Sequence, residues 1–240
     1  MKRKKIWHRL EPMLQADFLV RDRIPNYLGN LVGKRLLDAG CGDGYFSRLA
    51  VKKGAMVEAF DISDAMLKVA KQSDSTGINY QKGNMLEADN LFEASSFDAV
   101  IASCVMCAFD EFDLYKSISS LSKLVKEEGQ LIIGSNHMDS YLMQAESGWM
   151  KFITKPIDDS LTQKLGVEFI DQFGRVFFRE ECYYHSPERL VDAVENSGMV
   201  VLNVEPQYPS KNDLTHFPKR WGDESKIPYH IIINAIKRSE

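Results

Sequence analysis

The sequence predicts an α/β fold: a doubly wound, mostly parallel seven-stranded sheet with a cap insertion after the fifth strand. Short apolar runs alternate with segments of helical periodicity up to residue 134, and this order indicates a parallel sheet covered by helices on both faces. The alternation breaks between His137 and His185. A chain of 240 residues with 44% hydrophobic content can bury one large core. We therefore expect one domain over 1–240, with an N-terminal helical segment at 1–33 and an inserted subregion at 138–184.

The most specific pattern lies where the first predicted strand ends. An apolar pair at 36–37 stops at an acid and leads into three glycines on alternate positions, in the run Asp38-Ala39-Gly40-Cys41-Gly42-Asp43-Gly44. Glycines lack a Cβ atom, so the backbone can turn sharply and a ligand can lie directly against it. A helix predicted from Phe46 to Gly54 would point its unpaired N–H groups at the same place. The turn therefore predicts a site for a polar ligand.

The second predicted strand supports a nucleoside ligand. The apolar run 56–60 ends at Asp61, about 20 residues past the turn, where nucleoside-binding folds place an acid for the ribose hydroxyls. The dinucleotide fingerprint needs its third glycine at the position of Tyr45. The spacing therefore disfavours a pyrophosphate, and with it an NAD-dependent oxidoreductase.

The acid and the x-G-x-G-x-G run after it resemble the first motif of class I S-adenosylmethionine-dependent methyltransferases, and the resemblance covers most of the chain. It implies the Rossmann-like fold of that family and S-adenosyl-L-methionine as cofactor. In the family, the acid after the second strand binds the ribose, which implies this role for Asp61, with Ile62 against the adenine. Asn84 and Met85 stand where an acid usually lies beside the adenine amino group. Asn84 departs from that pattern, but its amide oxygen still accepts hydrogen bonds.

Further strands are expected at 78–81, 97–102, 131–134, 199–204 and 229–235. The resemblance implies that the last of these lies antiparallel beside the fifth. Expected helices include an amphipathic one around 6–18, a short one at 25–33, one capped by Ser63, one from Asp110 to Gly129, and one from Ser186 to Gly198. The carboxyl ends of parallel strands share one edge of a sheet, so Gly40, Asp61, Asn84, Ser103 and 135–137 should form one rim. Ser103 is accordingly a candidate cofactor contact.

The insertion is rich in aromatic residues, and a hairpin of 167–173 with 175–183 fits part of its pattern. Packing is the ordinary role of such residues. The place of the insertion after the fifth strand nevertheless puts its apolar surface at the rim. With help from the loop 206–228, the expected acceptor contacts are Trp7, Tyr141, Trp149, Tyr183 and Tyr184.

Displacement at a sulfonium methyl group requires alignment and exclusion of water, and a general base is optional. The candidate bases are His137 and His185, which flank the insertion, because an ordinary imidazole titrates near neutrality. A structural role is the alternative for either. No metal is expected, because the rim has few acids and Cys104-Val105-Met106-Cys107 has no second ligand pair.

Composition and net charge indicate which kinds of partner and which compartment to expect. A net charge of −4 provides no basic field for nucleic acid, and the cluster at 2–5 is expected to be a solvated tail. No apolar run has membrane-spanning length and no secretion signal is evident, which favours a cytoplasmic protein with reduced thiols at its four cysteines.

The segment after the fourth strand, 103–106, lacks the Asn/Asp-Pro-Pro-aromatic run found in enzymes that methylate the amino groups of nucleic-acid bases. An O or N nucleophile of a small organic acceptor is therefore the expected target. The alternatives are a methyltransferase acting on RNA or protein, and a cofactor-binding protein without transfer activity.

Overall fold

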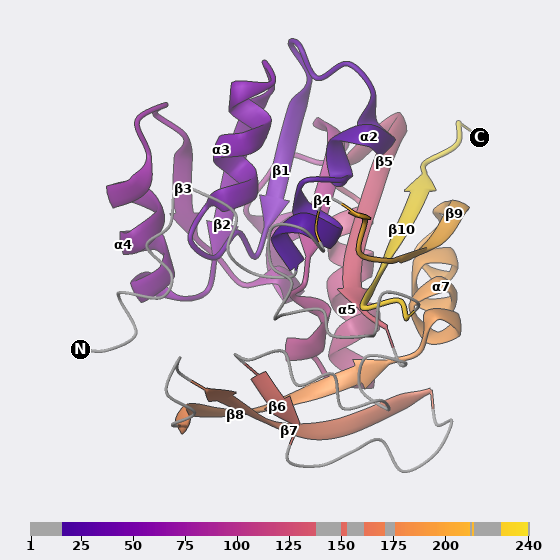
Figure 1. The fold of residues 1–240 in the computed structure, drawn as a ribbon. Coiled ribbons are helices and arrows are strands. Elements are labelled where there is room, and N and C mark those ends of the chain that lie inside the picture. Colours follow the sequence, from indigo (N-terminus) through magenta and orange to yellow (C-terminus); the bar gives the residue numbers. More distant parts are fainter. Residues whose placement is uncertain are drawn as a thin grey trace.

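The computed structural model describes residues 16–137, 150–152, 161–170, 176–211, 213 and 227–239. Its core is a seven-stranded sheet in the order β3-β2-β1-β4-β5-β10-β9, parallel throughout except for β10, which pairs antiparallel with both β5 and β9 (Figure 1). Its strands are β1 (Arg35–Ala39), β2 (Met56–Asp61), β3 (Asn79–Lys82), β4 (Phe97–Ser103), β5 (Val125–Asn136), β9 (Val200–Gln207) and β10 (His230–Ile236). The predicted fold class and the antiparallel last strand are confirmed.

Helices cover both faces of this sheet. One face packs against η1 (Asp17–Arg21), α2 (Ile24–Leu28), α3 (Tyr45–Lys52) and α4 (Asp64–Ser73). The other packs against η2 (Met85–Asn90), α5 (Glu111–Ser122) and α7 (Pro187–Asn196). The short helix η3 (Met106–Ala108) follows β4 directly. Because both faces are covered, the side chains of β1, β4 and β10 are nearly all buried, whereas those of the edge strand β9 are mostly exposed.

Three predicted helix starts are confirmed by their caps. The side-chain oxygens of Ser63, Asp110 and Ser186 accept backbone N–H groups three residues ahead, at 3.4, 2.9 and 3.2 Å. Such bonds satisfy N–H groups that have no partner inside the helix. At these positions, local sequence and fold agree.

Two predicted helix ends are wrong. The helix expected to close at Gly129 ends at Ser122, because Val125 pairs with Phe97 in the sheet and the Leu124 carbonyl accepts N–H groups from residues 96 and 97. The helix expected to reach Gly33 stops at Leu28, because Gly29 takes a left-handed φ of 67°. In both cases a contact or turn overrides the helical periodicity.

The segment between β5 and α7 contains a second, three-stranded antiparallel sheet of β6 (Met150–Phe152), β7 (Thr162–Ile170) and β8 (Val176–His185). The predicted hairpin is present as β7 and β8, but each strand begins or ends away from the expected bounds. Figure 1 shows this inserted sheet beyond the ends toward which the parallel strands run. Most of the predicted helix around 6–18 and most of the loop 206–228 lie outside the described residues.

Candidate cofactor and acceptor site

The glycine turn after β1 has the geometry of a ligand cradle. Gly40, Gly42 and Gly44 have φ angles of 70°, 55° and 74°, which L side chains rarely adopt. A Cβ at Gly40 would lie 2.8 Å from Val105 Cγ2, and one at Gly44 would collide with the Tyr80 hydroxyl. A Cβ at Gly42 would meet no described atom within 4 Å. The outer glycines are therefore demanded by packing, whereas the middle one borders open space.

Asp61 holds this turn from the end of β2. Its Oδ2 accepts the Gly42 N–H at 2.8 Å, and its Oδ1 accepts the Ser63 N–H at 2.8 Å. A carboxylate oxygen can accept more than one hydrogen bond, so the same group can also receive hydroxyl donors. Beside it, the side chain of Ile62 is 65% exposed. The end of β2 thus places an acceptor and an open apolar surface next to the glycine turn.

The next two residues of the predicted site, Asn84 and Met85, follow β3 at the start of η2. The Asn84 Oδ1 accepts the Leu86 N–H at 3.1 Å and so caps η2, and its second lone pair can accept a further donor. Met85 is buried, with its Cε 3.3 Å from where a Cβ of Gly40 would lie. Met85 therefore supports the turn, while Ile62 offers the exposed apolar side chain.

A buried charged group lies on the other side of the turn. Asp38 is buried and accepts the Ser47 hydroxyl; burial raises its pKa to about 6, although Ser47 and the charge of Arg21 act the other way. Arg21 pairs with the buried Asp17 at 2.8 Å and also interacts electrostatically with Asp43. Sequence reasoning did not identify Arg21. Its only local signal is the i, i+4 spacing from Asp17, which is common on helix surfaces.

Comparisons with known proteins agree with this arrangement. A family model described as "Methyltransferase domain" matches residues 37–133. The ubiquinone biosynthesis O-methyltransferase of Coxiella burnetii is 32% identical over 188 residues, which span 76% of this chain and 71% of that protein. The chain belongs to the class I S-adenosylmethionine-dependent methyltransferase family.

Two other similar proteins can be set beside this methyltransferase. The ubiquinone biosynthesis O-methyltransferase of Hahella chejuensis is 29% identical over 164 residues, and the match covers 61% of this chain but only 65% of that relative. A crystal structure of an S-adenosylmethionine-dependent methyltransferase from Mesorhizobium loti is similar in fold. Its TM-score is 0.68 at 23% identity, over 90% of this chain and 96% of that one.

The site of the methyltransferase fits the cofactor of its family, S-adenosyl-L-methionine. Ribose hydroxyls need an acceptor, and the Asp61 carboxylate lies beside the glycine turn. The adenine ring needs an apolar surface, and the side chain of Ile62 is exposed next to Asp61. The amino-acid tail carries a carboxylate, and the Arg21 guanidinium lies on the side of the turn where Asp38 and Asp43 are found.

Two polar side chains at the rim of the methyltransferase, Ser103 and His230, are buried. Ser103 Oγ and His230 Nδ1 have no hydrogen-bond partner among the described residues. Ser103, a predicted cofactor contact, is the last residue of β4, whereas sequence reasoning did not identify His230. His230 begins β10 opposite Asn136. Burial, with smaller contributions from the charges of Arg21 and Arg23, lowers the pKa of His230 to about 3.

The lowered pKa of His230 predicts that the folded protein loses stability in acid. An ordinary histidine titrates near 6.5, so between pH 6.5 and 3 the unfolded chain binds more protons, and stability falls as the pH falls. His230→Gln should remove this contribution, which amounts to about 2 kcal/mol at pH 5. Urea unfolding of both proteins from pH 7 to pH 4.5 measures the difference. Asp38, whose raised pKa acts in the opposite direction, is present in both proteins and cancels; parallel curves for the two proteins would contradict the prediction.

The two candidate bases have different surroundings. His137 is half-buried just after β5, and its backbone N–H donates to the Tyr229 carbonyl at 3.0 Å. His185 is 1% exposed, with its Nε2 3.0 Å from the Phe109 carbonyl oxygen and its Nδ1 3.2 Å from Thr162 Oγ1. Burial lowers the pKa of His185. Both ring nitrogens of His185 are therefore engaged inside the protein.

The predicted acceptor contacts are only partly described. Tyr183 is half-buried on β8 with its ring stacked on His185, at a centroid separation of 6.5 Å. Tyr184, on the opposite side of the same strand, is 2% exposed. Trp7, Tyr141 and Trp149 lie outside the described residues.

Within the described part of the chain, no three His, Cys, Asp or Glu side chains are grouped so as to hold a metal ion. No described helix is long and apolar enough to cross a membrane. All four cysteines are free thiols, and burial raises the pKa of Cys41.

Proposed function

We propose that this methyltransferase moves a methyl group from S-adenosyl-L-methionine to an oxygen nucleophile of a small organic acceptor, with a nitrogen nucleophile as the second choice. The observation that carries this proposal is the position of the inserted sheet beyond the ends of the parallel strands, in contact through His185 with the loop after β4. An acceptor between that sheet and the glycine turn would face the methyl group. Oxygen is favoured because the relatives from Coxiella and Hahella are named O-methyltransferases.

The residues of this chain would act mainly by holding and aligning. The cofactor supplies a sulfonium methyl group and its own leaving group, so the protein need not build a nucleophile. Asp61 accepts the ribose hydroxyls, Arg21 pairs with the carboxylate of the amino-acid tail, and Ile62 covers the adenine. Alignment of this kind can lower a barrier by roughly 7 to 11 kcal/mol in the best intramolecular cases.

A hydroxyl acceptor must lose a proton, and we propose His137 as its base. His137 lies at the rim beside α7, close enough to Glu188 of that helix to interact with its carboxylate. His185 is less suited to this role, because its Nε2 must carry a proton toward the Phe109 carbonyl and its Nδ1 faces Thr162.

The test is transfer of a labelled methyl group from S-adenosylmethionine to a panel of small phenols, alcohols and amines. His137→Gln should reduce kcat/KM at neutral pH by about 100-fold, the low end for a general base. The defect should shrink at high pH, where a phenol ionises unaided, and S-adenosylhomocysteine affinity should stay within a few-fold. An unchanged pH profile would exclude His137 as the base.

The same panel separates the alternatives. Methylation of RNA that falls steeply with added salt, and no turnover with small acceptors, would favour the nucleic-acid alternative. Tight binding of both sulfur nucleosides without turnover on any acceptor would favour a binding protein.

A further inference from the structure

The loop after β4, residues 104–109, touches the cofactor cradle. Its first residue, Cys104, has a φ of 56°, a conformation that is uncommon for residues other than glycine and that marks a sharp change of direction. The Val105 side chain then lies so close to Gly40 that a Cβ there would be 2.8 Å from it. Met106, which follows, is fully buried in the core. A displacement of this loop would therefore move one wall of the glycine turn.

His185 joins this loop to the inserted sheet. A carbonyl oxygen can only accept a hydrogen bond, so the Nε2 atom, 3.0 Å from the Phe109 oxygen, must carry the proton. The neutral ring then accepts at Nδ1 from the Thr162 hydroxyl on β7, at 3.2 Å. Tyr183 stacks on the ring from the same strand as His185. The imidazole therefore bonds the loop with one nitrogen and the inserted sheet with the other.

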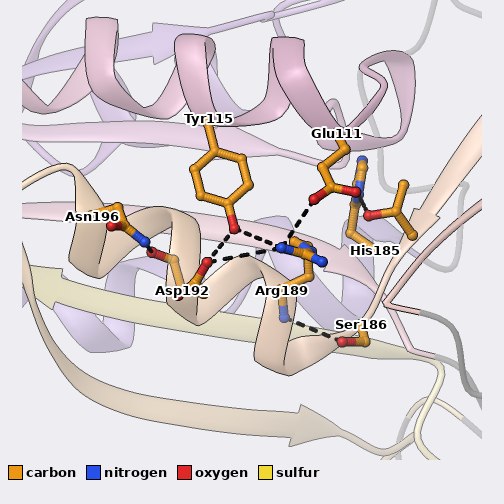
Figure 2. Close-up of polar contacts among 8 residues, drawn as sticks. Glu111, Tyr115, His185, Ser186, Arg189, Asp192 and Asn196 are labelled. Carbon is orange, nitrogen blue, oxygen red and sulfur yellow. Dashed lines mark hydrogen bonds and ion pairs between the residues drawn. The ribbon is translucent and has the colours of Figure 1, made fainter.

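A charged network fixes the helices on either side of this histidine. Figure 2 shows His185 beside Glu111 of α5, with Arg189 of α7 reaching Glu111 and Tyr115. Arg189 Nη1 is 3.0 Å from Glu111 Oε1 and 2.8 Å from the Tyr115 hydroxyl, which itself donates to Asp192. Because α5 begins just after the loop and α7 begins just after His185, this network connects the two helices that flank the His185–Phe109 bond.

We infer that His185 is a positioning residue, which ties the inserted sheet to the 104–109 loop and thereby holds Val105 against the glycine turn. The expected effect of His185 on methyl transfer rests on the proposed function, which places the acceptor beside the inserted sheet. The expected effect of His185 on cofactor binding does not rest on the proposed function, because it acts through the contact of Val105 with Gly40. The donor at Nε2 is the essential feature, and proton acceptance from substrate is not required.

Two amide variants separate the two nitrogens. The side-chain NH₂ of glutamine can reach the place of Nε2, so His185→Gln keeps a donor for the Phe109 carbonyl. The shorter asparagine places its amide near the position of Nδ1, so His185→Asn keeps only a partner for Thr162. His185→Phe fills the space without hydrogen bonds, and Thr162→Val is the matched control that removes the Nδ1 partner alone.

The first measurements need no acceptor: calorimetry with S-adenosylhomocysteine, and hydrogen exchange of the amides at 104–109 in the protein alone. Removing the donor from the part-buried Phe109 carbonyl should change the equilibrium between the docked and displaced loop by about tenfold. We expect His185→Phe and His185→Asn to weaken binding about tenfold and to speed loop exchange, whereas His185→Gln and Thr162→Val should stay within about threefold of wild type. Equal losses in the Gln, Asn and Phe variants, or no loss in any of them, would overturn the inference.

A third readout distinguishes this role from base catalysis. With whichever small acceptor the wild-type protein methylates, His185→Gln should recover most of the rate lost in His185→Phe, since glutamine cannot accept a proton at neutral pH. A Gln variant as inactive as the Phe variant, with cofactor binding intact, would make His185 a base and refute the positioning role. Failure of the wild-type protein to methylate any small acceptor would count against the proposed function alone, because the binding and exchange results stand without it.

Discussion

Replacing residues 138–184 with a short flexible linker should abolish methyl transfer to a small acceptor, while affinity for S-adenosylhomocysteine falls by no more than about tenfold, the loss expected when the link from His185 to the inserted sheet is broken. The predicted cofactor contacts Asp61, Gly42 and Asn84 lie at or just after the ends of strands of the main sheet, and none of them is in the replaced segment. The inserted sheet lies beyond the strand ends, where an acceptor would be enclosed (Figure 1). Because transfer depends on alignment and on exclusion of water, loss of this enclosure should reduce the rate far more than the affinity.

The truncated protein must first be shown to be folded, by a cooperative thermal transition and by its response to S-adenosylhomocysteine. The main sheet should survive, because the three apolar clusters of the described residues contain none from 138–184. A folded truncated protein that methylates the same acceptor at the native rate would show that the inserted segment serves packing and that the acceptor lies elsewhere.

Asp61→Ala should weaken S-adenosylhomocysteine binding by about 1.5 to 3 kcal/mol, or about 10- to 150-fold, the usual range for hydrogen bonds to a charged group. Two effects combine here: the ribose loses its acceptor, and the Gly42 N–H loses the carboxylate that fixes the turn. Asp61→Asn, which keeps one acceptor oxygen, should lose less. Calorimetry on the wild-type, Asp61→Ala and Asp61→Asn proteins measures the loss of affinity in each variant.

Glu58→Gln is the matched control for Asp61, because Glu58 lies on the same strand and its carboxylate pairs with Arg35, away from the rim. It should leave the affinity unchanged. A folded Asp61→Ala protein with wild-type affinity would remove Asp61 from the ribose site.

Much of the fold could be predicted from the sequence because the information is local. The apolar runs that became strands are bounded by turn residues, and the caps at Ser63, Asp110 and Ser186 use atoms only three residues away. The spacing between the glycine turn and Asp61 fixed the ribose candidate, because two adjacent parallel strands necessarily bring those ends together.

Other features depended on contacts between distant parts of the chain. The end of α5 was missed because the Leu124 carbonyl pairs with residues 96 and 97 of another strand, which no helical periodicity can reveal. Arg21 and His230 were missed for the same reason: each became a rim residue only when η1 and β10 packed beside the glycine turn and β5. Burial of Tyr184 likewise follows from the packing of the inserted sheet.

His185 shows most clearly which features the sequence determines and which depend on the tertiary structure. Its residue type and place after the insertion indicated, from sequence, a group that titrates near neutrality beside the acceptor site. The tertiary structure brings the Phe109 carbonyl and the Thr162 hydroxyl to its two nitrogens, although these residues lie 76 and 23 positions away. The sequence alone thus determined the sheet, its helix starts and the nucleoside-binding turn, all of which rest on neighbouring residues. Which polar groups are buried, and what each ring nitrogen faces, was decided only by packing between distant segments, because solvation and hydrogen-bond partners are properties of the folded chain.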